Sequence, residues 1–329
     1  MATTDTTGPG GRRTDLAGLA TEARRDDLSG IDEMATEAIV RTMNAEDRTV
    51  APAVAAAAAA IAAAVDAVAA RMARGGRLVY AGAGTAGRLG VLDASECPPT
   101  FNTDPEQVIG LIAGGPAAIR GAVENAEDDT RAAAADLDGL ELSPEDAVVG
   151  VSASGRTPYS VAAVCCAAGR GALTVGVSSN PGSPLGDAAD HAIEVDTGPE
   201  LITGSTRLKA GTAQKLVLNT LSTVTMIRLG KTYGNLMVDL LSTNEKLRAR
   251  AHRIVGMATG ADDDEVDRAL SAGAGDVKTA ILTILGRVGA EEAGRLLDAC
   301  GGRLRDAVET AARGDRIRPT PLSSEGSRQ

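Results

Sequence analysis

The chain has 329 residues, of which 43% are hydrophobic and only 1% are aromatic. This length allows two domains, or one large domain with appendages, and the core must be built from alanine, valine, leucine and isoleucine. The formal net charge is -11. Because no dense cluster of lysine and arginine offsets that charge, we expect no nucleic-acid partner.

Cysteine usage points to a reducing compartment. The four cysteines form no CxxC pair and are accompanied by only two histidines. They are Cys97, Cys165, Cys166 and Cys300. We therefore expect reduced thiols in the cytoplasm, and neither a metal nor a cofactor. The N-terminus lacks the apolar core of a signal peptide, and the apolar run Val50–Ala70 is mostly alanine with Asp66 inside it, which favours a soluble helix over a membrane span.

The first quarter of the chain is expected to be a disordered tail followed by helices. Residues 1–14 are rich in glycine, threonine and charge, which is typical of disorder. From Leu16 to Arg74 the spacing of apolar residues is helical, and Gly75 with Gly76 provides a stop.

Five short apolar runs follow, separated by helical stretches. They are Arg77–Ala81, Gln107–Ala113, Ala147–Val151, Leu173–Val177 and Ala192–Val195. This alternation predicts an α/β fold with a doubly wound, parallel five-stranded sheet that is covered by helices on both faces. Ligands bind at the carboxyl ends of the strands in such sheets, so the loops 82–87, 152–158 and 178–184 are candidates for a site.

The last third of the chain is predicted to be helical. A long helix is expected at about Leu208–Leu229, and a more charged helical part follows Thr243. Residues 265–281 align without gaps to residues 292–308, which predicts two matched helix–turn–helix units, although chance similarity in alanine- and glycine-rich sequence would look the same. We expect an α/β domain with N-terminal helices at 15–240 (core about 67–230), a helical subdomain at 241–312 and a disordered tail at 313–329.

The first strand leads into Gly82-Ala83-Gly84-Thr85-Ala86-Gly87, which satisfies the GxGxxG pattern of dinucleotide sites. A dinucleotide site also needs an acidic residue at the tip of the second strand to hold a ribose. The second strand ends in Ala113-Gly114-Gly115 instead, so a dinucleotide is disfavoured. What remains is a glycine-rich backbone that can close on an anion at a helix N-terminus.

The third strand leads into Ser152-Ala153-Ser154-Gly155-Arg156-Thr157. Three hydroxyls and exposed backbone N–H groups at the start of a helix suit a phosphate monoester without a metal. Serine and threonine also cap helices, but one hydroxyl suffices for a cap. We therefore favour an anion site over a simple cap, and the absence of a GxxxxGK[ST] pattern argues against a nucleotide triphosphatase.

Two glutamates stand out beyond the loops. Glu96 is expected to close the helix that follows the glycine loop, because Cys97-Pro98-Pro99 should stop it. A carboxylate at a helix C-terminus faces the negative end of the helix dipole, which suits a general acid, although a solvated glutamate at a frayed end is an equal alternative. Glu127 is expected on a helix that begins near Pro116, at the border between its apolar and polar faces. Two glutamates in different environments could divide acid and base roles.

Several blocks of this sequence closely resemble the N-acetylmuramic acid 6-phosphate etherases. The resemblance extends from about Thr21 to Val308, in the correct order. Its blocks are YAGAGTAGRLGVLDASECPPTF (80–101), SASGRTPYSVAA (152–163), SNPGSP (179–184), GPELITGSTRLKAGTAQKLVLNTLST (198–223) and YGNLMVDLLSTNEKL (233–247).

The resemblance implies a sugar isomerase (SIS) fold with a small C-terminal helical, UBA-like subdomain, in a homodimer with sites near the subunit interface. It implies cleavage of the D-lactyl ether of N-acetylmuramate 6-phosphate to N-acetylglucosamine 6-phosphate and D-lactate. Glu96 in the DASECPPT block would protonate the leaving group, and Glu127 in the ENAED block would be the other catalytic carboxylate. The substrate would contact a set of residues in the two loops. They would be Gly84, Thr85, Ser152, Ser154, Gly155 and Thr157.

The sequence departs from the family pattern at three positions near these blocks. Ala86 stands where a serine is usual, and Asn102 and Asn125 stand where glycines are usual. We expect these departures to affect the affinity for the substrate more than the type of reaction. The alternatives are a non-catalytic sugar-phosphate-binding protein, as in the longer glucokinase regulatory proteins, and a sugar-phosphate isomerase of the same fold.

Overall fold

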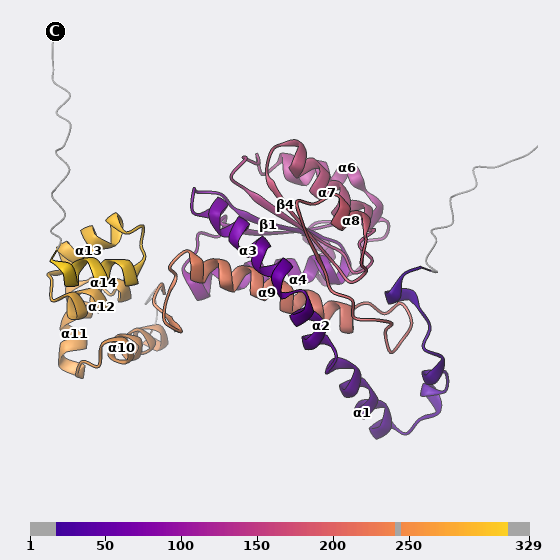
Figure 1. Ribbon diagram of the computed structural model, residues 1–329, viewed down its shortest axis with the longest axis horizontal. Coiled ribbons are helices and arrows are strands. Elements are labelled where there is room, and N and C mark those ends of the chain that lie inside the picture. The colour runs from indigo at the N-terminus through magenta and orange to yellow at the C-terminus, as the bar shows by residue number, and fades with distance from the viewer. Residues whose placement is uncertain (1–17, 241–244, 315–329) are drawn as a thin grey trace, which may run out of the picture.

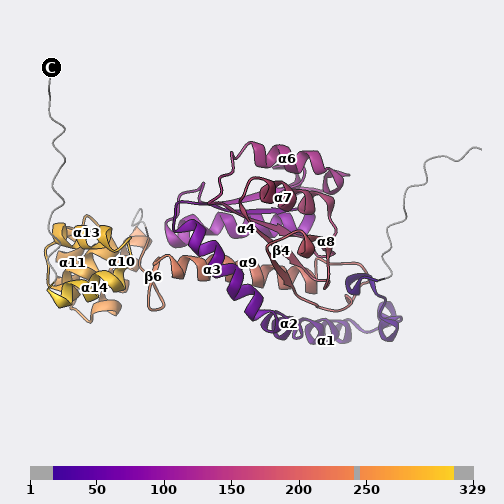
Figure 2. The same ribbon diagram turned by 45° about the horizontal axis from the view of Figure 1, so that its top comes forward.

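The computed structural model describes residues 18–240 and 245–314. The segment 1–14 and residues 315–329 of the tail 313–329, which were predicted to be disordered, lie outside these ranges, whereas Arg313 ends a helix and Gly314 caps it. A central α/β domain occupies the middle of the molecule, a cluster of helices lies beyond the end of helix α9 (Lys209–Arg228), and helix α1 (Thr36–Asp47) projects from the opposite end (Figures 1 and 2).

The predicted five-stranded parallel sheet is confirmed. Its strands are β1 (Leu78–Gly82), β2 (Val108–Ile112), β3 (Ala147–Val151), β4 (Leu173–Ser178) and β5 (His191–Glu194). They lie in the order β2-β1-β3-β4-β5, and every neighbouring pair is parallel. The three central strands are buried along their whole length because helices cover both faces, which explains why they read as continuous apolar runs.

The two faces of the sheet bury separate cores. Alternate residues of β1 point to opposite faces, so Leu78 and Tyr80 pack in one core whereas Val79 and Ala81 pack in the other. The first face is covered by α3, α4 and α9 and the second by α6 and α7. The bounds of the helices not yet given are α3 (Ala58–Met72), α4 (Gly84–Phe101), α6 (Thr130–Asp138) and α7 (Pro158–Gly169). Two further helices, α5 (Ala117–Arg120) and α8 (Pro184–Asp187), are short.

The N-terminal region differs in detail from the expectation of continuous helix. Residues 20–33 form three short 3-10 turns, and the alanine-rich run is broken at Ala57 between α2 (Val50–Ala56) and α3. No single helix among the described residues has the length and apolar character needed to cross a membrane, although the bent pair Thr36–Ala56 and Ala58–Met72 meets that criterion when taken together. Helix α1 is fully described and contains no buried residue.

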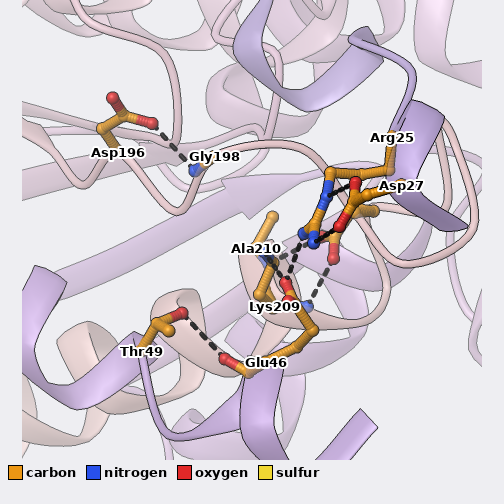
Figure 3. Close-up of polar contacts among 9 residues, drawn as sticks. Arg25, Asp27, Glu46, Thr49, Asp196, Gly198, Lys209 and Ala210 are labelled. Atoms are coloured by element: carbon orange, nitrogen blue, oxygen red, sulfur yellow. Dashed lines mark hydrogen bonds and ion pairs between the residues drawn. The ribbon is translucent and has the colours of Figure 1, made fainter. Parts of the chain in front are cut away.

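A partly buried ionic network fixes the N-terminal region against α9 (Figure 3). Glu46 on α1 accepts hydrogen bonds from Lys209 Nζ at 2.7 Å and from Arg25 Nη1 at 2.9 Å. Burial opposes ionisation of Glu46, but these two cations outweigh it and lower the pKa of its carboxyl. The fully buried Glu200 accepts the backbone N–H groups of Lys209 and Ala210 and so caps the start of α9.

The predicted long helix and the C-terminal repeat are both confirmed. After α9, strands β6 (Thr232–Tyr233) and β7 (Leu236–Met237) form a hairpin that was not predicted. Residues 245–314, the C-terminal module, contain five helices around one apolar core. They are α10 (Glu245–Thr259), α11 (Asp263–Ala272), α12 (Val277–Gly286), α13 (Ala290–Ala299) and α14 (Leu304–Arg313). The two copies of the repeat are the pairs α11–α12 and α13–α14.

Candidate active site

The candidate site lies at the carboxyl edge of the sheet, between β1 and β3. Gly82 is paired with Ile112 on one side and with Val151 on the other, so the loops after β1, β2 and β3 leave the sheet side by side. The strand order reverses between β1 and β3, which is where ligands bind in doubly wound sheets. One chain therefore brings the glycine loop and the serine loop together.

The glycine loop has two different kinds of glycine. A side chain at Gly82 would meet the backbone of Gly87 at 2.8 Å, and one at Gly87 would meet the carbonyl of Gly82 at 2.5 Å. These two glycines allow strand β1 and helix α4 to touch. Gly84 is different, because its φ is +54° and a side chain there would have no heavy atom within 4 Å. The open backbone at Gly84 starts α4, and Thr85 beside it packs against Gly211 of α9.

The three hydroxyls of the serine loop converge on one another. Ser152 Oγ lies 2.8 Å from Thr157 Oγ1 and 3.3 Å from Ser154 Oγ. Thr157 is the N-cap of α7, but its side chain makes no capping bond to the described helix. The backbone N–H of Gly155 donates to Ser152 Oγ. A cluster of rotatable hydroxyls at a helix N-terminus can reorient to bind an anion, as predicted for a phosphate.

The neighbouring loop after β4 packs against the serine loop and fixes its backbone. Gly155 has a φ of +66°, and a side chain there would meet Cβ of Ser183 at 2.3 Å, so only glycine fits. Ser183 in turn donates to Glu194 and caps helix α8. Asn180 donates to the carbonyl of Ala153. The SNPGSP block therefore shapes the serine loop from the next strand.

Glu127 lines a cavity of about 250 Å³ together with Gly84 and Arg88, at the same edge of the sheet. The predicted helix from Pro116 to Glu127 is wrong. The helix ends after one turn at Arg120, Gly121 is extended, and Glu127 lies in a 3-10 turn at Ala126–Asp128.

Arg88 explains why the helix before Glu127 ends so early. Its guanidinium donates to the carbonyls of Ile119 and Gly121 and holds this segment against α4. The segment is thereby shaped as a loop around the cavity rather than as an amphipathic helix, and Val123 is 42% exposed.

Glu96 lines a second cavity, of about 540 Å³, with residues of α9 and of the β6–β7 hairpin. The predicted stop at Pro98 and Pro99 is wrong, because α4 continues through both prolines to Phe101 and ends at Asn102. Glu96 is thus more than one turn from the helix end, where the dipole effect has faded. The argument from the dipole does not apply, and Glu96 is exposed on the wall of the cavity.

Asp93, one turn before Glu96, is a functional candidate that the sequence reading missed. It is buried in the wall of the same cavity and accepts hydrogen bonds from three side chains. The donors are Tyr80 Oη at 2.7 Å, Asn219 Nδ2 at 2.5 Å and Ser222 Oγ at 3.1 Å. Burial raises the pKa of Asp93, and the hydrogen bonds oppose that shift only in part. The sequence signal that could have identified Asp93 is an acidic residue on the apolar face of the helix that follows the glycine loop.

The two glutamates line different cavities. Gly84 belongs to the cavity of Glu127, and Glu96 is 12 residues further along the same helix. At the rise of an α-helix this separation is about 18 Å. The chain therefore places Glu127 in a cavity near the serine loop and Glu96 in a second cavity near the hairpin.

The structure explains the three departures from the family pattern. Asn102 has a φ of +49° and Asn125 a φ of +60°, which is the region where glycine is favoured and asparagine is the best-tolerated alternative. Ala86 is buried in the main core with 7% of its surface exposed.

The described residues contain no cluster arranged to hold a metal, and the thiol nearest Asp93 is not activated. No group of three or more histidine, cysteine, aspartate or glutamate side chains in residues 18–240 and 245–314 is arranged to hold a metal ion. Burial raises the pKa of Cys97, the thiol beside Asp93, to about 12. This thiol is protonated and unsuited to act as a nucleophile.

Comparisons with known proteins connect these features to one family. Residues 60–168 match the glucokinase regulatory protein N-terminal SIS domain, and residues 130–224 match the SIS domain. A Streptomyces avermitilis protein named N-acetylmuramic acid 6-phosphate etherase is 66% identical, over 91% of this chain and 96% of its own length. Relatives of the same name from Streptomyces coelicolor and Mycolicibacterium smegmatis are 65% and 51% identical over 91% and 89% of this chain and 96% and 99% of their own lengths. The chain belongs to the N-acetylmuramic acid 6-phosphate etherase family.

Proposed function

We propose that the chain cleaves the D-lactyl ether of N-acetylmuramate 6-phosphate, giving N-acetylglucosamine 6-phosphate and D-lactate in the recycling of cell-wall amino sugar. The relatives are named for this activity. The observation that carries the proposal is the position of Glu127, which lines a cavity at the same sheet edge as the convergent hydroxyls of the serine loop. A carboxylate beside an anion-binding loop suits proton transfer on a phosphorylated sugar.

The reaction needs a base, an acid and a water molecule. The sugar opens to its aldehyde, which makes the proton on C2 acidic. Glu127 removes this proton, the electron pair forms a C2–C3 double bond, and the bond from C3 to the lactyl oxygen breaks. Glu96 protonates that oxygen, so D-lactate leaves, and water then adds across the double bond with its hydroxyl on C3 and a proton on C2. Two carboxyl groups with distinct surroundings can divide the acid and base roles in this way.

We assign substrate binding to the two loops. The phosphate would be held by the hydroxyls of Ser152, Ser154 and Thr157 and by the backbone at Gly155, at the N-terminus of α7. Gly84 and Thr85 would face the sugar, because the open backbone at Gly84 lies on the cavity of Glu127. This arrangement calls for neither a metal ion nor a cofactor.

We also propose a homodimer in which Glu96 of the partner subunit completes the site around Glu127. In one chain the two glutamates line separate cavities, and Gly84, which lines the cavity of Glu127, is about 18 Å from Glu96 along α4. Each cavity carries a large, half-exposed apolar side chain, Ile227 beside Glu96 and Val123 beside Glu127, as expected of surfaces that meet another chain. Helix α1 has no buried side chain within one chain, so its surface is also free to contact the partner subunit.

Release of D-lactate from N-acetylmuramate 6-phosphate by the purified protein tests the proposal. In deuterated water the N-acetylglucosamine 6-phosphate should also carry deuterium at C2, because the proton is removed and later replaced from solvent. The match to the glucokinase regulatory protein domain favours a second candidate, a protein that binds the sugar phosphate without converting it. Folded protein that binds the substrate but releases no lactate would support this second candidate and overturn the first.

We further propose a division into an α/β domain at 15–240 and a helical subdomain at 241–312, and a cytoplasmic location. Separate apolar cores in the sheet domain and in the C-terminal module support the division, although residues 241–244 at the boundary lie outside the described ranges. Four cysteines that are free in the described structure fit a reducing compartment.

A further inference from the structure

The β6–β7 hairpin connects the cavity of Glu96 to the C-terminal module. Its two-residue turn is Gly234-Asn235, and both residues line that cavity. Gly234 has a φ of +57° and is the first residue of the turn, the position where a tight hairpin requires glycine. The turn therefore places Asn235, in a fixed backbone geometry, on the wall of the cavity that Glu96 also lines.

The sides of the hairpin belong to the C-terminal module rather than to the sheet domain. Tyr233 and Leu236 pack against the apolar core of the module, and Val238 and Leu240 are buried within it. The guanidinium of Arg305 on α14 lies 5.1 Å from the centre of the Tyr233 ring, within cation–π distance.

A buried ion cluster fixes both ends of the hairpin to the module. Asp239 Oδ2 accepts from Lys231 Nζ and from Lys278 Nζ, each at 2.9 Å, and Lys278 also donates to the carbonyl of Gly302. Burial opposes ionisation of Asp239, but the two lysines outweigh it and lower the pKa of the carboxyl. Lys231 precedes the hairpin, Asp239 follows it and Lys278 lies on α12, so the cluster joins three segments.

We propose that the C-terminal module holds the hairpin in position, and that Asn235 is a substrate-positioning residue in the cavity of Glu96. The module sets the position of the turn, and the Asn235 carboxamide hydrogen-bonds the part of the substrate that approaches Glu96. A carboxamide both donates and accepts, which suits the ether and carboxyl oxygens of a leaving hydroxy acid. This inference rests on the proposed function, because Glu96 is taken as the acid for that leaving group.

The first test is Asn235→Ala. We expect kcat/KM for D-lactate release to fall about tenfold, the usual value of one hydrogen bond to a polar substrate group. The loss should fall on kcat rather than on KM, since the phosphate loop sets affinity and this contact is made to the leaving group. An unchanged kcat in an active preparation would overturn the assignment, whereas no activity in the unsubstituted protein would reject the proposed function instead.

The second test asks whether the module acts through Asn235. Arg305→Ala and Lys278→Met each loosen the hairpin, the first from an exposed position that should not affect folding. Each should lower kcat in the natural background and have little further effect when combined with Asn235→Ala, because the same contact is already lost. Arg295→Ala, which breaks two ion pairs on the surface of α13 away from the hairpin, is the matched control and should leave kcat unchanged. Additive losses in the double variants would contradict the claim that the module affects catalysis by positioning Asn235.

Discussion

The serine loop and the pair of glutamates differ in how much of the site a single chain completes. The loop is assembled within one chain: its hydroxyls contact one another, and the glycine at its centre is packed against the next loop. The glutamates line separate cavities, and each cavity is bordered by a different part of α4. In the proposed homodimer, phosphate binding therefore depends on the fold of one chain, whereas the chemistry depends on how two chains meet.

Removal of either carboxylate should have the largest effect. Glu96→Gln and Glu127→Gln each keep the size of the side chain but abolish proton transfer, so kcat for D-lactate release should fall about 100- to 10,000-fold. Both residues are exposed, so the melting temperature should barely change. Asp128→Asn, next to Glu127 on the same 3-10 turn, is the control and should retain activity. Full activity in Glu127→Gln would remove Glu127 from the mechanism.

Substitution in the serine loop should separate binding from chemistry. Thr157→Ala and Ser154→Ala each remove one hydroxyl donor to the phosphate, so KM should rise about tenfold while kcat changes little. Thr310→Ala removes a hydroxyl that contacts only the Asp306 carbonyl and the Cys300 thiol in the described structure, within the C-terminal module, and serves as the control. A fall in kcat with KM unchanged would show that the loop does not bind the ground state, contrary to its assigned role.

The backbone before Glu127 should have a smaller effect, which distinguishes conformation from side-chain chemistry. Asn125 has a φ of +60°, so Asn125→Ala introduces strain of roughly 1–2 kcal/mol and should displace Glu127, with a several-fold loss of kcat. Asn125→Gly removes the same side chain without strain and should stay close to the natural activity. Equal losses in the two variants would indicate that the Asn125 amide itself contacts the substrate.

The amino edge of the sheet should affect stability and not catalysis. Arg77 and backbone N–H groups donate to the buried Asp146 and, against the effect of burial, lower the pKa of its carboxyl. Because the folded-state pKa lies below the unfolded value of about 3.9, this stabilisation is complete above that value and is lost as the pH falls through the folded-state pKa. Asp146→Asn should lower the melting temperature by about 5 °C at pH 7, by less in strong acid, and should leave KM unchanged. A difference independent of pH would show that charge is not its source.

The sheet, the site loops at its carboxyl edge and the C-terminal repeat could be predicted, because each depends on local periodicity and on turn residues. The runs that became β1, β3 and β4 are apolar on both faces, and glycines mark the loops that follow them. The two helices around the glutamates could not be predicted in detail, because tertiary contacts decide them. Arg88 draws the segment before Glu127 into a loop, and packing against α9 carries α4 through two prolines that should have ended it. The hairpin was missed because its strands have only two residues each and are held by a module far along the chain.

The shared site can be tested directly by mixing the two inactive variants. Glu96→Gln supplies an intact Glu127, and Glu127→Gln supplies an intact Glu96, so a mixed dimer has one complete site and one site lacking both carboxylates. With random pairing of equal amounts, half of the dimers are mixed, and D-lactate release should recover to about one quarter of the unsubstituted rate. Two-tag purification of coexpressed chains would isolate the mixed dimer. If that mixed dimer remained as inactive as its parents, both glutamates would have to act within a single chain, and the shared site would be wrong.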